Sequence, residues 1–149
     1  MKKICLLLFA VVFTAVACNG TPKLRQDSIL EIKEHKYSVQ IADTPEERAL
    51  GLSGIPAISD GEGMLFLFSE PQKLQFWMKG MLFPIDIIWI NGNKIVDITE
   101  NVQPQINTPE ISLPTYSPSQ DADKVLEVKG GWAIKHDIRI GDTFTLNNP

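Results

Sequence analysis

Hydrophobic and polar positions alternate through residues 29–41, in two arms separated by a polar stretch. Each arm gathers its apolar residues on one face, with Leu30 and Ile32 in the first arm and Tyr37, Val39 and Ile41 in the second. Alternation with a period of two is typical of β-strands. The pattern therefore predicts a β-hairpin that turns near Glu34–Lys36.

The alternation ends at the sequence DTPEERALGLSG, where the pattern changes to that of a short helix. Thr44 is a suitable N-cap, and Pro45 suits the first helical position. Glu47 completes a Thr-x-x-Glu capping box. We expect the helix to end at Gly51 or Gly54, because glycine readily adopts the left-handed conformation that closes a helix.

Apolar runs of strand length follow this helix. They predict strands at 63–68, 74–79, 85–90, 94–100, 124–128 and 143–147. The sequence Asn-Gly-Asn-Lys joins the third and fourth of these strands and is a strong hairpin signal. Residues 101–123 hold four prolines and little periodicity. A compact domain rarely carries so long an irregular segment unless it is functional or mobile. One helical turn is expected within 130–142.

Short links between successive strands favour antiparallel pairing. The strand Ile85–Ile90 is apolar on both faces apart from Asp86, so it is expected to be covered on both sides. The prediction is therefore an α+β fold, mainly antiparallel β. It consists of a single small curled sheet or partly closed barrel of about seven strands, with one or two short helices.

The N-terminal segment has the layout of a secretory signal. Lys2 and Lys3 precede an apolar core of about ten residues and then small residues. This core is shorter than the ~20 residues of a membrane-spanning helix. Cys18 follows Ala-Val-Ala and resembles the lipobox cysteine of bacterial lipoproteins, which is lipidated and becomes the new N-terminus. The alternative is ordinary cleavage near Ala17, which would release a soluble protein.

These features predict a signal peptide at 1–17, a polar tether at 18–28 and a single β-rich domain at 29–149. The protein is then an exported, membrane-anchored lipoprotein that faces the periplasm or the cell surface. The signal carries two of the 14 basic residues and none of the 18 acidic ones, so the mature chain has a formal net charge of −6. An acidic domain is a poor partner for nucleic acid, which selects clustered Lys and Arg.

Six segments occur in one order along the chain: ADTPEERALGL, GMLFLF, FWMK, PIDIIWI, VLEVKGG and IRIGD. Together they resemble domain of unknown function 192, the DUF192 family, over residues 29–146. The resemblance implies a small β-rich domain that is often exported, and it brings no established activity. This chain departs from the family at Ser53, where the family has methionine. It departs again at Gly80 and Met81, where the family has Asn-Thr.

Few residues have the spacing of a catalytic or metal site. The two histidines of the mature chain, His35 and His136, lie outside any ligand-spaced motif, and zinc requires three or four such ligands. Ser53 lacks the Gly-x-Ser-x-Gly context of a nucleophile. Glu62 and Glu70 flank a strand and are expected to be solvated. No metal and no cofactor is predicted, and the catalytic residues of any enzyme activity are not identified.

The strongest candidate site surrounds two charges in an apolar stretch, Lys79 and Asp86. If the strands 74–79 and 85–90 form a hairpin, the two charges flank its loop. Asp86 needs a partner, because a buried unpaired charge costs several kcal/mol. That partner is expected to be Lys79, or Arg48 on the helix. One hypothesis is a structural ion pair.

The other hypothesis is a ligand pocket at the same place. Trp77 would form its wall, Lys79 or Arg48 would contact an anion, and Tyr116 would cover it. The function predicted is a binding or accessory module of the cell envelope, with a small molecule or an envelope protein as partner. One alternative is an envelope hydrolase that uses acidic residues near Asp86. Another is a structural partner of an envelope protein, with an exposed apolar patch and no pocket.

Overall fold

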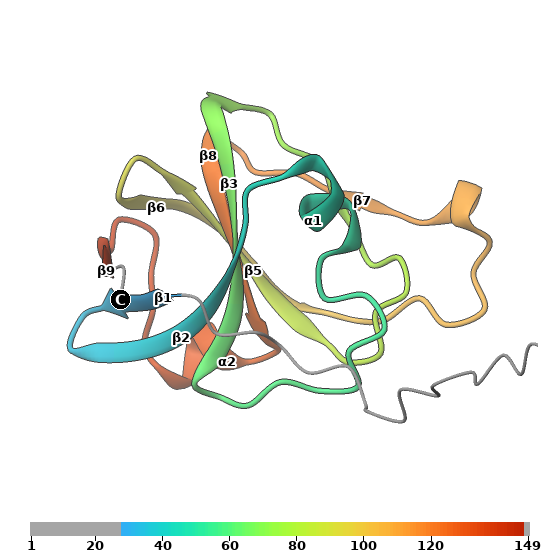
Figure 1. The fold of residues 1–149 in the computed structure, drawn as a ribbon, viewed down its shortest axis with the longest axis horizontal. Coiled ribbons are helices and arrows are strands. Elements are labelled where there is room, and N and C mark those ends of the chain that lie inside the picture. The colour runs from blue at the N-terminus through green and yellow to red at the C-terminus, as the bar shows by residue number, and fades with distance from the viewer. Residues whose placement is uncertain (1–27, 148–149) are drawn as a thin grey trace, which may run out of the picture.

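Seven strands form one curled sheet in the order β6-β5-β8-β3-β2-β1-β9 in the computed structural model, which describes residues 28–147 (Figure 1). The strands are β1 (Ser28–Ile32), β2 (His35–Ala42), β3 (Glu62–Gln72), β5 (Ile85–Asn91), β6 (Lys94–Val102), β8 (Ala122–Lys129) and β9 (Phe144–Asn147). The predicted signal peptide, Cys18 and most of the tether lie outside the described residues. Within 28–147, no helix has the length and apolarity to cross a membrane.

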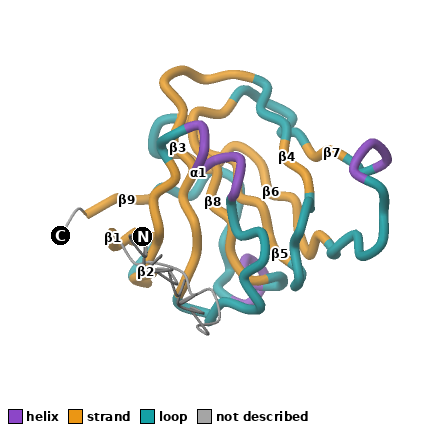
Figure 2. The backbone as a smooth tube through the Cα atoms, turned by 45° about the vertical axis from the view of Figure 1, so that its right-hand side comes forward, coloured by secondary structure: helices purple, strands orange, loops and turns teal. Residues whose placement is uncertain are grey.

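The smaller elements lie outside this sheet. They are the two-stranded sheet of β4 (Phe76–Trp77) and β7 (Thr115–Tyr116), the helices α1 (Pro45–Leu50) and α2 (Trp132–Lys135), and the 3-10 turn η1 (Glu110–Ser112). Figure 2 places α1 over one face of the large sheet, with β4 and β7 next to it. The predicted class, a mainly antiparallel curled sheet with one or two short helices, is confirmed, and the helices number two within residues 28–147.

All neighbouring strands in the large sheet are antiparallel except β2 and β3, which are parallel. The connection between these two strands carries α1. The two edges of the sheet meet at one end, where Ile95 N–H donates to the carbonyl of Asp142 at 2.9 Å and Phe144 N–H donates to that of Asn93 at 3.0 Å. The sheet is therefore a partly closed barrel, because its two edge strands, β6 and β9, come together only at this end.

The first hairpin turns one residue earlier than predicted. Ile32 pairs with His35, so the turn consists of Lys33 and Glu34, and Lys33 has a φ of +50°. A two-residue turn with a positive φ matches the twist of a hairpin. The second predicted hairpin, between β5 and β6, forms as expected, and its Gly92 has a φ of +61°.

Helix α1 begins with the predicted capping box. Thr44 Oγ1 accepts a hydrogen bond from Glu47 N–H at 3.2 Å, and the Glu47 carboxylate accepts one from Thr44 N–H at 3.2 Å. These bonds lower the pKa of Glu47. The helix ends at Gly51, whose φ is +52°. The cap fixes the direction in which α1 crosses the sheet.

Thr44→Ala is expected to lower the free energy of unfolding by about 1 kcal/mol, because Glu47 N–H then loses its acceptor. Chemical denaturation followed by tryptophan emission measures this loss. Thr44→Ser keeps the hydroxyl and serves as the control. An unchanged midpoint for the alanine variant would show that the cap does not stabilise α1.

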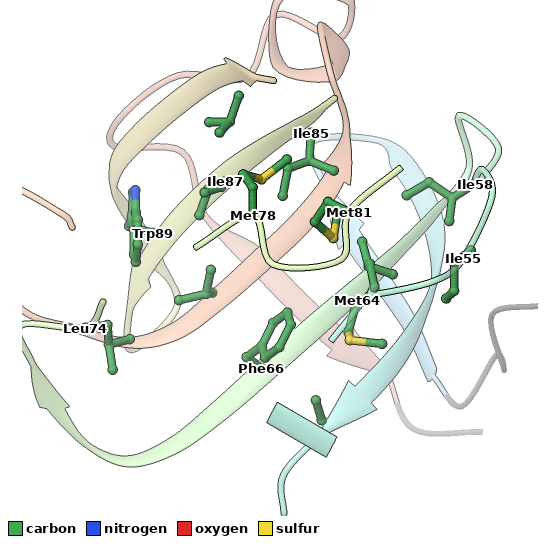
Figure 3. Close-up of a cluster of buried hydrophobic side chains, with 14 of the residues drawn as sticks. Ile55, Ile58, Met64, Phe66, Leu74, Met78, Met81, Ile85, Ile87 and Trp89 are labelled. Atoms are coloured by element: carbon green, nitrogen blue, oxygen red, sulfur yellow. The ribbon is translucent and has the colours of Figure 1, made fainter. Parts of the chain in front are cut away.

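The core is divided by the sheet into two clusters of buried side chains. Strand β5 supplies both, with Ile85, Ile87 and Trp89 facing the first cluster and Ile88 and Ile90 facing the second. The first cluster is completed by the chain segments that precede and follow β3. Figure 3 shows Ile55 and Ile58 from the preceding segment and Met78 and Met81 from the following one. Trp132 and Ala133 of α2 complete the second. Strand β5 is thus covered on both faces, as its sequence predicts.

Candidate functional site

The expected hairpin between 74–79 and 85–90 is wrong. Strand β4 pairs instead with β7, and Phe76 lies opposite Tyr116. After β4 the chain turns at Gly80, whose φ is +68° and whose carbonyl accepts a hydrogen bond from Gly54 N–H at 2.9 Å. This turn ties the segment to the residues that follow α1.

Asp86 is fully buried, as expected, but it pairs with neither Lys79 nor Arg48. Its carboxylate accepts three backbone hydrogen bonds, from Asn101 at 2.7 Å, Gly131 at 3.0 Å and Ala133 at 2.8 Å. Charge-assisted bonds of this kind compensate for the cost of desolvating a carboxylate. Asp86 therefore joins β6 to the first turn of α2.

Lys79 lies at the surface with a carboxylate from the long segment 103–121. Its Nζ is 2.8 Å from Glu110 Oε1 and 5.3 Å from the centroid of the Trp77 ring. Arg48 donates to the backbone carbonyls of Asp43 at 2.6 Å and Leu67 at 3.0 Å. Both cations thus stand close to aromatic or backbone groups on the same side of the sheet.

A small cavity of about 30 Å³ lies between α1, β4 and β8. Its lining includes three predicted site residues, Arg48, Trp77 and Lys79. The other lining residues are Ala49, Leu50, Gly51, Leu52, Phe66, Phe76, Met81 and Glu127. Asp86 does not line it, and neither does Tyr116, which packs against the first cluster. The structure therefore brings together three of the five residues predicted from sequence.

Glu127 is the lining residue that the sequence analysis missed. It lies on β8 between Met64 of β3 and Ile87 of β5, on the face of the first cluster, and only 4% of it is exposed. Within residues 28–147 its carboxyl group has no hydrogen-bond or ion-pair partner. Burial raises its pKa to about 8. At neutral pH the group is therefore mostly protonated.

A signal for Glu127 is present in the sequence. Strand β8 contains the run Val-Leu-Glu-Val, in which one acid interrupts an apolar strand just as Asp86 does in β5. An acid in an apolar strand needs a partner or a role at both positions, because burial of a charge is costly. The two acids differ in their surroundings, since backbone donors meet Asp86 and apolar side chains meet Glu127.

The departures from the family pattern at Ser53 and Gly80 meet in space. A Cβ atom built on Gly80 would lie 2.0 Å from Ser53 Oγ, and the φ of +68° already disfavours a side chain there. We therefore expect Gly80→Ala to destabilise the protein by about 1–3 kcal/mol.

Ser53→Gly should recover the steric part of that loss and leave the part due to backbone conformation. Chemical denaturation of the wild type, both single variants and the double variant measures the coupling between the two positions. Additive losses in the double variant would contradict a direct contact.

The two histidines also come together, although they are far apart in sequence. The rings of His35 and His136 are 5.4 Å apart, and His136 Nε2 lies 3.1 Å from Asp60 Oδ2. Tyr37 packs beside them, and its buried hydroxyl has no partner within the described part of the chain. No group of three or more His, Cys, Asp or Glu in residues 28–147 is arranged to hold a metal ion.

Comparison with known proteins places the fold among solved structures. The chain is similar to a candidate transcription regulator from Sinorhizobium meliloti, with 24% identity, a TM-score of 0.72 and coverage of 85% of this chain and 98% of the other. It is also similar to a protein of unknown function from Novosphingobium aromaticivorans, with 27% identity, a TM-score of 0.69 and coverage of 88% and 91%. Comparison with curated proteins gives no match. Residues 28–146 match the model of the DUF192 family, described as "uncharacterized ACR", and the chain therefore belongs to that family.

Proposed function

We propose that this protein is an exported, lipid-anchored domain of the cell envelope that binds a small molecule in the cavity between α1, β4 and β8. The binding proposal rests on one observation. Glu127 is buried at this cavity and has no partner among residues 28–147. A buried polar group without a partner is costly to the fold, and binding sites are where proteins commonly retain one.

The surroundings of Glu127 support a ligand rather than a purely structural role. Aromatic and apolar walls with a few convergent polar groups are typical of small-molecule sites. The volume, about 30 Å³, is far below the ~300–1,000 Å³ of drug-sized sites, so the cavity admits only a terminal group of a ligand whose remainder lies at the surface. The structural-partner alternative predicts no pocket and is less consistent with this cavity.

The hydrolase alternative receives less support from the same geometry. Among the described residues that line the cavity, Glu127 is the only acid. Asp86 is enclosed, and its carboxylate is already bonded to three backbone N–H groups. Hydrolysis by acidic groups generally requires two that act together on one substrate. Binding without chemistry is therefore the simpler proposal.

Solution NMR with three matched probes tests the binding proposal. We suggest n-butanol, n-butylamine and pentanoate, which share a linear alkyl chain and differ in charge. At least one of them should shift the backbone amides of residues 48–52 and 127 in a saturable way. Glu127→Gln should change the response to at least one probe, whereas Glu70→Gln, an exposed control on β3, should not. Spectra that are unchanged at these amides with all three probes would contradict the proposal.

The membrane anchor is proposed from the sequence alone. Cys18 follows an apolar segment and small residues, which is the position of the acylated cysteine in a lipoprotein. We expect mass spectrometry of the mature protein to find an acylated Cys18 at its N-terminus. Cys18→Ala, which removes the acceptor thiol, is expected to release the protein from the membrane fraction. An unmodified N-terminus downstream of Cys18 would contradict anchoring by lipid.

A further inference from the structure

Exposed apolar side chains gather on three segments of the surface. Within residues 28–147, five of the exposed large apolar residues belong to α1, to the segment 74–83 or to the segment 103–114, and only Ile29, Ile134 and Ile140 lie elsewhere. Single exposed apolar side chains are normal, whereas a group of them marks an interaction surface. The five residues are called here the apolar face: Leu50 (64% exposed), Trp77 (44%), Leu82 (54%), Ile106 (71%) and Ile111 (97%).

Direct contacts join the three segments. Trp77 of β4 pairs with Thr115 of β7, and Lys79 Nζ lies 2.8 Å from Glu110 Oε1 in η1. The segments on either side of these contacts therefore lie next to each other. Leu50 and Trp77 line the same small cavity, which brings the end of α1 to this pair of segments. The apolar face thus occupies one region of the surface.

The segment 103–114 carries two of these side chains away from the large sheet. Figures 1 and 2 both show its turn η1 projecting from the rest of the domain. No residue of η1 is buried, so packing within residues 28–147 does not account for the isoleucine that it carries. Pro104, Pro109 and Pro114 restrict the backbone of this segment. A restricted loop loses less conformational entropy when it contacts a partner.

The two loop segments of the apolar face are electrically neutral, although the domain is acidic. The mature chain has a formal net charge of −6, whereas 74–83 and 103–114 together contain only Lys79 and Glu110, which pair with each other. A bilayer that contains anionic lipids would repel this region less than the rest of the domain. Tryptophan and a lysine with a long alkyl stem are also typical of the boundary between a membrane and water.

We propose that the apolar face rests on a lipid bilayer and inserts Trp77, Ile106 and Ile111 into its interfacial layer. The proposal rests on the lipid anchor proposed above and adds a second contact with the same membrane. Ser28 comes ten residues after Cys18, so the first strand begins within about 35 Å of the anchor. A tether this short keeps the bilayer at a high effective concentration, so a weak contact is sufficient to orient the domain.

The contact is limited to the interfacial layer. The loop 103–114 is irregular apart from η1, and its backbone polar groups would lose their hydrogen bonds to water in the hydrocarbon core. The headgroup layer is polar enough to hydrate this backbone and the Lys79–Glu110 pair. The apolar side chains alone therefore reach the acyl chains.

Quenching of tryptophan emission by brominated lipids tests this contact. The lipidated protein is anchored in vesicles of phosphatidylethanolamine and phosphatidylglycerol, with and without bromine on the acyl chains. Trp89 and Trp132 are buried, so Trp77 is the tryptophan that can approach the lipid. We expect its emission to be lower in the brominated vesicles. Trp77→Phe should remove the difference between the two kinds of vesicle.

Two pairs of substitutions locate the contact on the protein. Ile106→Asn combined with Ile111→Asn should reduce the quenching by at least about half, because the inserted side chains no longer favour the acyl chains. Ile134→Asn combined with Ile140→Asn is the matched control, since these isoleucines are 70% and 60% exposed and lie outside the apolar face. The control should keep the wild-type quenching. Equal quenching in both double variants would overturn the proposal.

Cosedimentation with vesicles measures the contact without the anchor. The mature chain produced without acyl groups should bind increasingly as the lipid concentration rises. Ile106→Asn combined with Ile111→Asn should weaken this partition by at least about tenfold, the effect of losing the burial of two apolar side chains. Added salt should change the partition little, because the two loop segments carry no net charge. A partition that is lost at high salt would show a charge-driven contact and contradict the apolar one.

The outcomes distinguish this proposal from the proposed anchor. If the lipidated protein stays in the membrane fraction and brominated lipids do not quench Trp77, the anchor stands and the contact is wrong. If mass spectrometry finds no acyl group and the chain still partitions into vesicles through Ile106 and Ile111, the anchor is wrong and the contact stands. Sedimentation velocity covers a different occupant. A dimer that dissociates in the Ile106→Asn and Ile111→Asn variant, without quenching or partition, would assign the apolar face to a second copy and overturn the proposal.

Discussion

Glu127→Gln is expected to remove most of the pH dependence of stability between pH 5 and 9. The pKa of Glu127 is about 8 in the folded protein and 4.5 as the ordinary value of the unfolded chain. The folded state therefore binds one proton more than the unfolded state between these values. Wild-type stability should fall as pH rises across this window, by up to about 1.4 kcal/mol per pH unit, and then level off above pH 8.

Chemical denaturation at pH 5, 7 and 9, followed by tryptophan emission, measures this slope. Glu127→Gln is neutral at every pH and nearly isosteric, so its slope should be much smaller. Exposed Glu70→Gln is the matched control and should retain the wild-type slope. The acids with lowered pKa, such as Asp60 and Asp97, affect stability mainly as pH falls toward and below their ordinary values, outside this window. Wild-type stability that is constant from pH 5 to 9 would contradict a buried, unpaired Glu127.

Asp86→Ala should destabilise the domain by about 3–5 kcal/mol, because removing one partner of a buried charged network leaves the other groups unsatisfied. Three backbone N–H groups lose their acceptor at once, those of Asn101, Gly131 and Ala133. Each unsatisfied buried donor costs ~1–3 kcal/mol. The loss is a large fraction of the ~5–15 kcal/mol that stabilises a typical domain.

Denaturation curves for Asp86→Ala, Asp86→Asn and the exposed control Asp121→Ala test this network. The asparagine variant keeps one acceptor oxygen and should lose less than the alanine variant. Asp121→Ala should lie close to the wild type. A loss below about 1 kcal/mol for Asp86→Ala would mean that the three bonds do not stabilise the fold.

Local features of the fold were predictable from the sequence, because their causes lie within a few residues. The capping box at Thr44, the Asn-Gly turn after β5 and the apolar character of β5 all follow from adjacent side chains. The parallel pairing of β2 with β3 is different, because it depends on how the intervening α1 segment packs. The pairing of Phe76 with Tyr116 depends on residues 40 positions apart.

The candidate site was predicted only in part for the same reason. Burial of Asp86 follows from its apolar neighbours, but its partners are backbone N–H groups, which any residue provides and no sequence pattern marks. Lys79 is marked by its charge at the end of an apolar run, and alternation places Trp77 on the same face of that segment. Glu127 completes the pocket from β8, about 50 positions later in the chain, so only the folded sheet brings it there.

The pairing of β1 with β9 has a consequence for how the protein folds. β1 is the first strand of the domain. The backbone groups along one of its edges pair only with β9, the last strand, where Leu30 lies opposite Leu146. Until the C-terminal residues have been synthesised, that edge exposes unpaired backbone groups next to apolar side chains, a surface that invites pairing with other chains. A topology dominated by such distant contacts folds in milliseconds to seconds rather than microseconds. The domain therefore completes its sheet only after residues 144–147 have been synthesised, and until then this edge of β1 is open to pairing with other chains.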